Sequence, residues 1–357
     1  YTHLATTTTT NSNFNNALAS GRSISGMGNP NLGWERNKQV DVGLDVGFFN
    51  NRLSIMYDYY SKRTDALLFS LEVPISSGFY NIQSNAGKLK FWGHELSVSS
   101  KNLTGKLQWT TDLNISYNDN KCLQLGVDDA PIIGNNITQV GERIGQFYGL
   151  VWEGVYKNKE EFDKYPKHSQ ADVGTIRFKD VNGDGKVTQG DDRDIIGNPV
   201  PLWIVGMTNS FTYKNFDLSI LGTYSIGGKV YDSLYAGSME VMYAGNTWNK
   251  HALRRWQQPG DITDVPRIQI GGSYTASDRF LVDASYFAIK NITLGYTIPK
   301  QWLKKAGLES VRIFGSVDNL ALFSHLDGMD PQYNFKGETD YSYAPNKTYS
   351  VGFEINF

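Results

Sequence analysis

The feature that most constrains this sequence is a series of nine segments in which apolar and polar residues alternate, joined by connections that switch strictly between short and long. In an extended strand, successive side chains point to opposite faces, so each segment has one apolar and one polar face. The first two segments, 38–48 and 52–62, meet at Asn50-Asn51, residues that adopt positive φ at low cost in tight turns. We therefore expect a hairpin there and an all-β fold.

The alternation recurs along the whole chain. Residues 1–37 are polar and rich in Gly and Asn, and we expect them to be a loop region. The short connections are tight turns or, at 300–306, one turn of amphipathic helix. The long connections are 63–87, 118–201, 228–286 and 321–346. The remaining segments with strand character are 88–99, 107–117, 203–213, 216–224, 292–298, 311–317 and 347–357.

Long connections at one end and short turns at the other are typical of transmembrane β-barrels, whose periplasmic turns are short and whose extracellular loops are long. The apolar faces carry no charge through their middles, and aromatic residues gather near the strand ends, as in barrel girdles. Segment 347–357 would rise about 26 Å along an axis tilted near 45°, close to the height of the apolar band. A soluble β-sandwich with 347–357 as its edge strand is the alternative.

The odd number of strands carries a second inference. If the short turns are periplasmic, the ninth strand ends in the periplasm and the first begins outside, which places 1–37 on the extracellular side. Bacterial single-chain barrels have an even number of strands and both ends in the periplasm. We therefore expect 38–357 to be the carboxy-terminal part of a larger barrel in the bacterial outer membrane. The open edge of the last strand would then pair with another piece of polypeptide.

Composition excludes several other classes. The net charge of −2 gives no electrostatic surface for nucleic acid. No run of 18 apolar residues exists that could form a transmembrane helix, and the start at Tyr1 lacks the pattern of a signal peptide, which indicates a processed chain, a fragment or a protein that is not exported. Cys122 is the only cysteine, and the five histidines are scattered without metal-binding spacing. No catalytic constellation is evident, so we do not expect an enzyme.

The sharpest motif lies in the connection 118–201. Oxygen-bearing side chains stand at positions 1, 3, 5, 9 and 12 of a loop with Gly at position 6, the spacing of an EF-hand-type calcium loop. Position 7 would offer a backbone carbonyl, and the flanking helices of an EF-hand are missing. The alternative is a well-capped turn without metal, and calcium, if bound, would rigidify an outside loop. The candidate ligands are Asp180, Asn182, Asp184, Lys186, Thr188 and Asp191.

Aromatic residues in the long connections are candidates for contact with a substrate or a partner. Such side chains can stack on sugars or clamp a peptide, although packing of the loops against one another explains many of them equally well. The candidates are Tyr148, Trp152, Trp248 and Trp256.

Several strings, taken together and in order, resemble the SusC-like family of TonB-dependent transporters of Bacteroidetes. They include N-P-N-L-G-W-E at 29–35, F-K-D-V-N-G-D-G-K-V-T at 178–188, I-I-G-N-P-V-P at 195–201, S-F-T-Y-K-N-F-D-L-S-I at 210–220, D-A-S-Y-F-A-I-K-N-I-T-L-G-Y-T-I-P at 283–299 and V-D-N-L at 317–320. The resemblance covers nearly the whole chain. It implies the last nine strands of a 22-stranded barrel, with the plug domain and the upstream strands outside these residues.

The resemblance also implies a function. Members of the family import glycan fragments or oligopeptides, of which we expect glycans first, with a SusD-like lipoprotein as a lid and TonB acting on the missing amino-terminal region. Connections 118–201 and 228–286 are the expected lid contacts, and pairs of transporter and lid could dimerise. Phe357 resembles the terminal signal that barrel-assembly machinery recognises. A passive porin or structural barrel, and a soluble carbohydrate-binding β-sandwich, are the alternatives.

Overall fold

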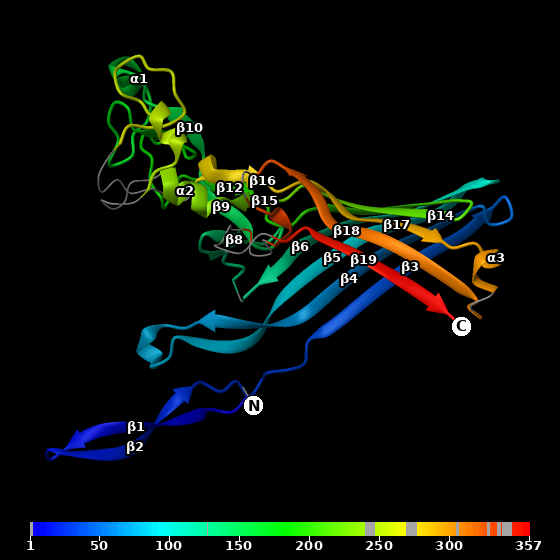
Figure 1. Cartoon of the computed structure of the whole chain (residues 1–357). Helices are drawn as coiled ribbons and strands as arrows, with labels where there is room; N and C mark the ends of the chain where they lie inside the picture. Colours follow the sequence, from blue (N-terminus) through cyan, green and yellow to red (C-terminus); the bar gives the residue numbers. More distant parts are fainter. Residues whose placement is uncertain are drawn as a thin grey trace.

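A nine-stranded antiparallel sheet forms the body of the protein (Figure 1). The computed structural model describes residues 3–126, 128–239, 247–268, 277–304, 307–326, 329–333, 337 and 345–357. Strands that follow one another in sequence pair with one another, and the expectation of an all-β, antiparallel fold is confirmed. In order across the sheet, the strands are β3 (Arg36–Phe48), β4 (Leu53–Glu72), β5 (Asn81–Thr104), β6 (Leu107–Leu125), β13 (Trp203–Tyr213), β14 (Phe216–Ile226), β17 (Tyr286–Thr297), β18 (Ser310–Ser324) and β19 (Thr348–Asn356).

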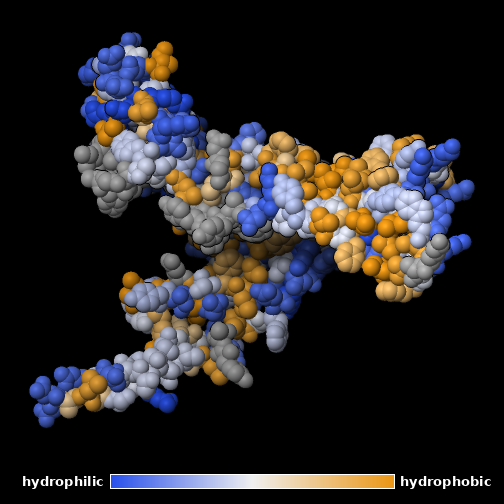
Figure 2. Space-filling view, in the orientation of Figure 1, coloured by the Kyte–Doolittle hydropathy of each residue, from blue (hydrophilic) through white to orange (hydrophobic). Residues whose placement is uncertain are grey.

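One face of this sheet exposes apolar side chains. Val40, Val42 and Leu44 on β3 are 61–62% exposed, and Val351 on β19 is 86% exposed. Figure 2 shows hydrophobic residues spread over the wall of strands and hydrophilic ones at the ends of the short turns. A soluble sandwich would cover such a face with a second sheet. Among the described residues, no helix has the length and apolar character needed to cross a bilayer.

Two rows of aromatic rings border the apolar face. One row lies toward the long connections and the other toward the short turns, as in the girdles of membrane barrels. Where neighbouring rings of a row meet, their centroids stand 4.8–6.5 Å apart, a distance at which aromatic rings attract. The first row, here called the outer girdle, contains Tyr59, His94, Tyr117, Trp203, Tyr224, Phe287 and Phe323, and the second contains Trp109, Phe211, Phe216 and Tyr296.

The opposite face is polar and contains ion pairs between strands. The guanidinium of Arg312 on β18 donates two hydrogen bonds to Asp217 on β14, at 3.0 and 2.6 Å. It also lies 3.5 Å from Glu354 on β19. Such a lining suits the water-filled interior of a barrel.

The tight turns match the sequence. Phe49, Asn50 and Asn51 all have positive φ, and the Arg52 N–H donates to the Phe48 carbonyl at 3.1 Å. The hairpin predicted at Asn50-Asn51 is therefore confirmed. The helical turn predicted at 300–306 begins with α3 (Lys300–Leu303), and residues 305–306 lie outside the described part of the chain.

The loop predicted for residues 1–37 is wrong in its first part. β1 (Thr6–Phe14) and β2 (Ala17–Gly26) pair as a hairpin that turns at Asn15 and Asn16, both at positive φ. Because nearly all of its residues are exposed, the hairpin buries no face and needs no apolar alternation. Its β-branched threonines favour the extended backbone nonetheless.

The long connection predicted at 63–87 is also much too long. β4 runs to Glu72 and β5 starts at Asn81, with η1 (Ile75–Ser77) between them. The pairing continues past an irregularity at Ala66, which has a positive φ. β6 and β18 likewise continue past 118 and 321. Beyond the membrane band, backbone pairing persists without a lipid-facing pattern, so alternation alone does not mark these strand ends.

The connections predicted at 118–201 and 228–286 build a lobe at the end of the sheet away from the short turns (Figure 1). A four-stranded sheet, in the order β12-β9-β8-β7, and two two-stranded sheets form its frame. Connections 228–286 and 321–346 are described only in part. The elements of the lobe are β7 (Ile132–Ile133), β8 (Asn136–Thr138), β9 (Gln146–Leu150), β10 (Trp152–Val155), α1 (Lys159–Lys164), β11 (Ile176–Phe178), β12 (Arg193–Gly197), β15 (Lys229–Tyr231), α2 (Ser233–Met239), η2 (Lys250–Arg254), η3 (Asp278–Phe280) and β16 (Leu281–Asp283), followed later in the chain by η5 (Pro331–Tyr333).

The two hydrophobic clusters found in the described part of the chain lie in this lobe. One cluster joins α2, η2 and η3, and a second joins β9 and β11 to the loop that follows β11. The buried members of the clusters are Ala236, Met239, Ala252, Val265 and Phe280 in the first and Leu150, Phe178 and Val187 in the second.

Candidate functional site

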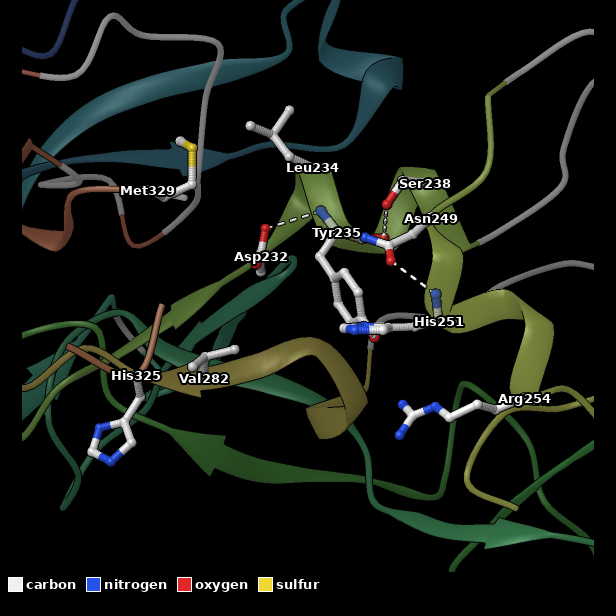
Figure 3. Close-up of a pocket in the computed structure, with 10 residues that line it drawn as sticks. All are labelled: Asp232, Leu234, Tyr235, Ser238, Asn249, His251, Arg254, Val282, His325 and Met329. Atoms are coloured by element: carbon white, nitrogen blue, oxygen red, sulfur yellow. Dashed lines mark hydrogen bonds between the residues drawn. The ribbon is translucent and has the colours of Figure 1, made fainter. Parts of the chain in front are cut away.

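A cavity of about 490 Å³ opens in the lobe beside α2 (Figure 3). Its volume falls in the range of small-molecule sites. Charged and polar side chains from α2, η2 and the segment after β18 converge on it. The lining residues are Asp232, Leu234, Tyr235, Ser238, Asn249, His251, Arg254, Val282, His325 and Met329.

Tyr235 stands at the centre of this cavity. Its backbone N–H donates to the Asp232 carboxylate at 3.0 Å, which fixes the start of α2. Its hydroxyl lies 3.0 Å from Nδ1 of His251, and the two rings meet edge to face (Figure 3). The backbone N–H of His251 donates to the side-chain carbonyl of Asn249 at 3.0 Å, which caps the start of η2. The polar groups of the cavity are thus held in place before any ligand arrives.

The chemistry of the cavity is that of binding. A phenol is protonated at neutral pH and can donate a hydrogen bond, and burial raises the pKa of Tyr235 further. Arg254 is more than half exposed, lies 3.6 Å from Asp264, and offers further donors. Hydroxyl, amide, imidazole and guanidinium groups line the cavity and suit a ligand with many polar groups.

The four aromatic candidates chosen from sequence lie elsewhere in the lobe. The Arg193 guanidinium stacks over the Tyr148 ring, 4.7 Å from its centroid, and Trp248 packs against the hydrophobic cluster that includes α2. The indole N–H of Trp152 donates to the Gly154 carbonyl, and that of Trp256 donates to the Lys157 carbonyl, each at 3.0 Å. All four are partly buried and none lines the cavity. Their contact with a substrate or lid stays a prediction.

The EF-hand-like loop follows β11. Both carboxylate oxygens of Asp180 accept backbone hydrogen bonds, from Gly183 at 2.7 Å and Gly185 at 2.8 Å. Asn182 accepts from the Asp184 N–H, and Asp184 accepts from the Lys186 N–H. The side chains at positions 1, 3 and 5 therefore fold into the same turn.

The other end of the loop differs from the prediction. Asp191 is exposed and its carboxylate accepts from the Thr188 hydroxyl at 3.2 Å. The next residue, Asp192, is 0% exposed and accepts the backbone N–H groups of Val181, Asn182 and Thr188. Asp192 therefore ties the two ends of the loop together. Sequence reasoning missed it because the motif spacing directs attention to the residue before it.

The donor set of this loop has the hard oxygen atoms that calcium prefers. In the part of the chain that the structure describes, however, no three His, Cys, Asp or Glu side chains come together as a metal group. The carboxylates bond to backbone N–H groups of the turn, which accounts for their inward orientation without an ion. Calcium at this loop stays a prediction.

Phe357 follows β19 and is 89% exposed. Its part in barrel assembly also stays a prediction.

Comparisons with known proteins agree with this architecture. Residues 4–320 match the family profile of the TonB dependent receptor-like β-barrel. The TonB-dependent receptor P3 of Formosa agariphila is 34% identical over an alignment of 365 positions, gaps included, which covers 94% of this chain and 35% of that protein. The TonB-dependent receptor SusC of Bacteroides thetaiotaomicron is 28% identical and is matched over 92% of this chain and 32% of its own length. This chain therefore spans about a third of the length of these relatives.

Among solved structures, the RagAB peptide transporter superposes with a TM-score of 0.84 at 24% identity, over 100% of this chain and 39% of that chain. The RagAB peptide importer in its 'closed-closed' state gives the same score at 25% identity, over 100% of this chain and 39% of that one. These matches confirm the resemblance to SusC, the outer-membrane location and the place of the chain within a partial barrel, and they exclude the soluble β-sandwich. They also agree with the expectation that the protein is not an enzyme. The chain belongs to the TonB-dependent receptor family and forms part of its outer-membrane β-barrel.

Proposed function

We propose that the complete protein imports glycan fragments across the outer membrane in a TonB-dependent cycle. The observation that carries the proposal is the pairing of a lipid-facing sheet with a folded lobe, whose polar cavity beside Tyr235 has a size suited to a small ligand. Sugars present many hydroxyl groups, and the Ser238 hydroxyl, the Asn249 amide and the Tyr235 phenol line the cavity.

A SusD-like lipoprotein is the proposed lid. The lobe stands at the end of the sheet opposite the short turns, which in outer-membrane barrels is the extracellular end. It therefore lies where a surface lipoprotein could cover it. TonB would act through the plug, which is not part of these 357 residues. Pairs of transporter and lid could associate as dimers.

Oligopeptides are the second candidate substrate. The observation in their favour is the fold similarity to RagAB, which is described as a peptide importer. A peptide would engage the charged groups of the cavity, Asp232 and Arg254, more than the hydroxyl and amide groups. A passive porin is the remaining alternative, and it would need neither TonB nor a plug.

The test uses the full-length transporter in a strain that lacks its own copy. Growth on a panel of glycans and on a peptide mixture identifies the substrate, and the same panel is repeated without TonB. Asn249→Ala and Arg254→Ala each remove one group from the cavity. Loss of one hydrogen bond to a charged or buried group costs about 1–3 kcal/mol, so uptake at low substrate concentration should fall roughly 5- to 150-fold.

Arg267→Ala is the matched control, because Arg267 pairs with Asp172 at 2.8 Å and does not line the cavity. Uptake that persists without TonB would favour the porin. Growth on peptides alone would replace the glycan assignment. Equal losses from the cavity variants and the control would show that the cavity is not the substrate site.

A further inference from the structure

A row of four cations crosses one face of β3, β4, β5 and β6. Lys38 stands opposite Arg63, Arg63 opposite Lys90, and Lys90 opposite Lys121. Neighbouring strands lie about 4.8 Å apart, so the row extends over roughly 15 Å. We call these four residues the cation row.

The cation row lies on the lipid side of the sheet. Side chains two residues apart in a strand share a face. Lys38 shares the face of the exposed Val40 and Val42, and Lys121 shares that of Tyr117 in the outer girdle. On β4, Arg63 of the cation row lies four residues beyond Tyr59 of the outer girdle, on the side of the long connections.

That distance places the row at the depth of lipid headgroups. Four residues advance about 13 Å along a strand, and a strand tilt near 40° turns this into about 10 Å of height above the girdle. Aromatic girdles mark the boundary between acyl chains and headgroups. The row therefore stands in the headgroup layer on the side of the long connections, which is the outer leaflet.

The protein itself neutralises the row only in part, with one carboxylate for four cations. Like charges directly opposite one another in a sheet are destabilising. Asp65 serves both Arg63, at 2.7 Å, and Lys38, at 3.7 Å. Among the described residues, Lys90 and Lys121 form no ion pair with a carboxylate.

A nearby carboxylate, that of Asp119, already pairs with another cation. Asp119, which shares the face of Lys121, holds Arg143 through two hydrogen bonds at 2.7 and 3.0 Å. The Lys90 ammonium lies 5.4 Å from the ring of Trp92, between the row and the girdle. Lys38 and Arg63 keep 75% and 49% of their side-chain surface exposed. The row thus presents an excess of positive charge outward.

We infer that the cation row binds the phosphate groups of an anionic lipid in the outer leaflet. Phosphate oxygens accept the hydrogen bonds that Lys and Arg donate, and several phosphates can be served along a row of this length. The apolar face begins directly below, at Val40, Tyr59 and Trp92, where acyl chains of the same lipid would lie. This continuity of a charged row with a lipid-facing surface favours a lipid over a free anion.

The test uses the full-length transporter in nanodiscs of phosphatidylcholine doped with a bisphosphorylated lipid A. Native mass spectrometry after mild delipidation counts the retained lipid, and titration gives its affinity. Lys90→Gln with Lys121→Gln removes the two cations that lack an acidic partner. A basic residue at an anionic surface contributes about a fivefold gain in affinity, so the double variant should bind roughly 25-fold more weakly.

The control is Lys62→Gln with Lys106→Gln, since Lys62 faces the interior of the barrel and Lys106 lies in a short turn at the other end. It should retain lipid like the unaltered protein, and salt should weaken binding in both. An unchanged affinity of the Lys90/Lys121 variant would overturn the inference. So would equal retention of a dephosphorylated lipid A. Full displacement of the lipid by inorganic phosphate would reveal a site for the free ion and refute the lipid assignment.

Discussion

Met207 offers a direct test of which face of the sheet meets lipid. It lies on β13 midway between Trp203 and Phe211, the residues of that strand that belong to the two girdles. It stands opposite Leu113 on β6, is 41% exposed, and lies about 13 Å along the strand from either girdle. An arginine at the midplane of a lipid face costs about 2–4 kcal/mol. Met207→Arg should therefore lower the folding equilibrium constant roughly 30- to 700-fold.

The assay is reversible unfolding of the full-length transporter in lipid vesicles by guanidinium. Thr208→Arg is the matched control, because the adjacent side chain points to the interior beside Asp112. It should change stability by less than about 1 kcal/mol, as substitutions outside special sites usually do. If Thr208→Arg were as damaging as Met207→Arg, the assignment of faces would be wrong. Met207→Leu keeps the volume and the apolar character of the side chain, so it separates the loss of methionine from the gain of charge.

Three further predictions concern the lobe. Burial on its own raises the pKa of Asp192, but hydrogen bonds from the backbone N–H groups of Thr188, Val181 and Asn182 outweigh it and lower the pKa overall. The stability that Asp192 supplies is therefore complete above about pH 4 and is lost as the pH falls through the lowered pKa of the folded state, and hydrogen exchange of the loop can follow this loss. Asp192→Asn should cost about 1–3 kcal/mol of stability at neutral pH and should weaken the dependence of stability on pH. Gly174→Ala should destabilise the lobe by about 2–3 kcal/mol, measured by limited proteolysis, because a Cβ at this position would collide with the Trp256 ring. Gly183 also has a positive φ, but a Cβ there would meet open space, so Gly183→Ala should cost only about 1 kcal/mol. Calorimetry of the full-length protein should detect calcium binding that Asp180→Asn with Asp184→Asn abolishes, and an unchanged heat signal in that variant would remove the metal assignment.

The membrane part of the fold could be predicted because lipid imposes a period. Val40, Val42 and Leu44 alternate with polar residues since one face meets acyl chains and the other meets water. The turn at Asn50-Asn51 could also be predicted from the sequence, because few residue types adopt positive φ. Outside the bilayer this constraint ends. β4 continues to Glu72 and the threonines of β1 form a strand, yet neither segment needs an apolar face there.

The candidate site was less accessible to sequence reasoning. The aromatic residues Trp152 and Trp256 attracted attention by their type, but their indole groups bond to backbone carbonyls of the lobe. The cavity instead gathers residues from α2, from η2 and from His325, which are far apart in sequence. Only the spatial arrangement brings them together. Asp192 was overlooked for a related reason, since its three N–H donors come from both ends of the loop.

The distribution of burial shows that two solvents shape this chain. Most fully buried side chains, including Tyr156, Leu150 and Val230, belong to the lobe, whereas Val351 and Phe353 of β19 remain exposed. Water drives the lobe together through hydrophobic burial, and that force is absent between the sheet and acyl chains. The sheet is held instead by its inter-strand hydrogen bonds, which have no competitor in a bilayer. A denaturant that acts on exposed apolar surface should therefore unfold the lobe while the sheet stays paired, and the polar cavity should be lost before the barrel wall.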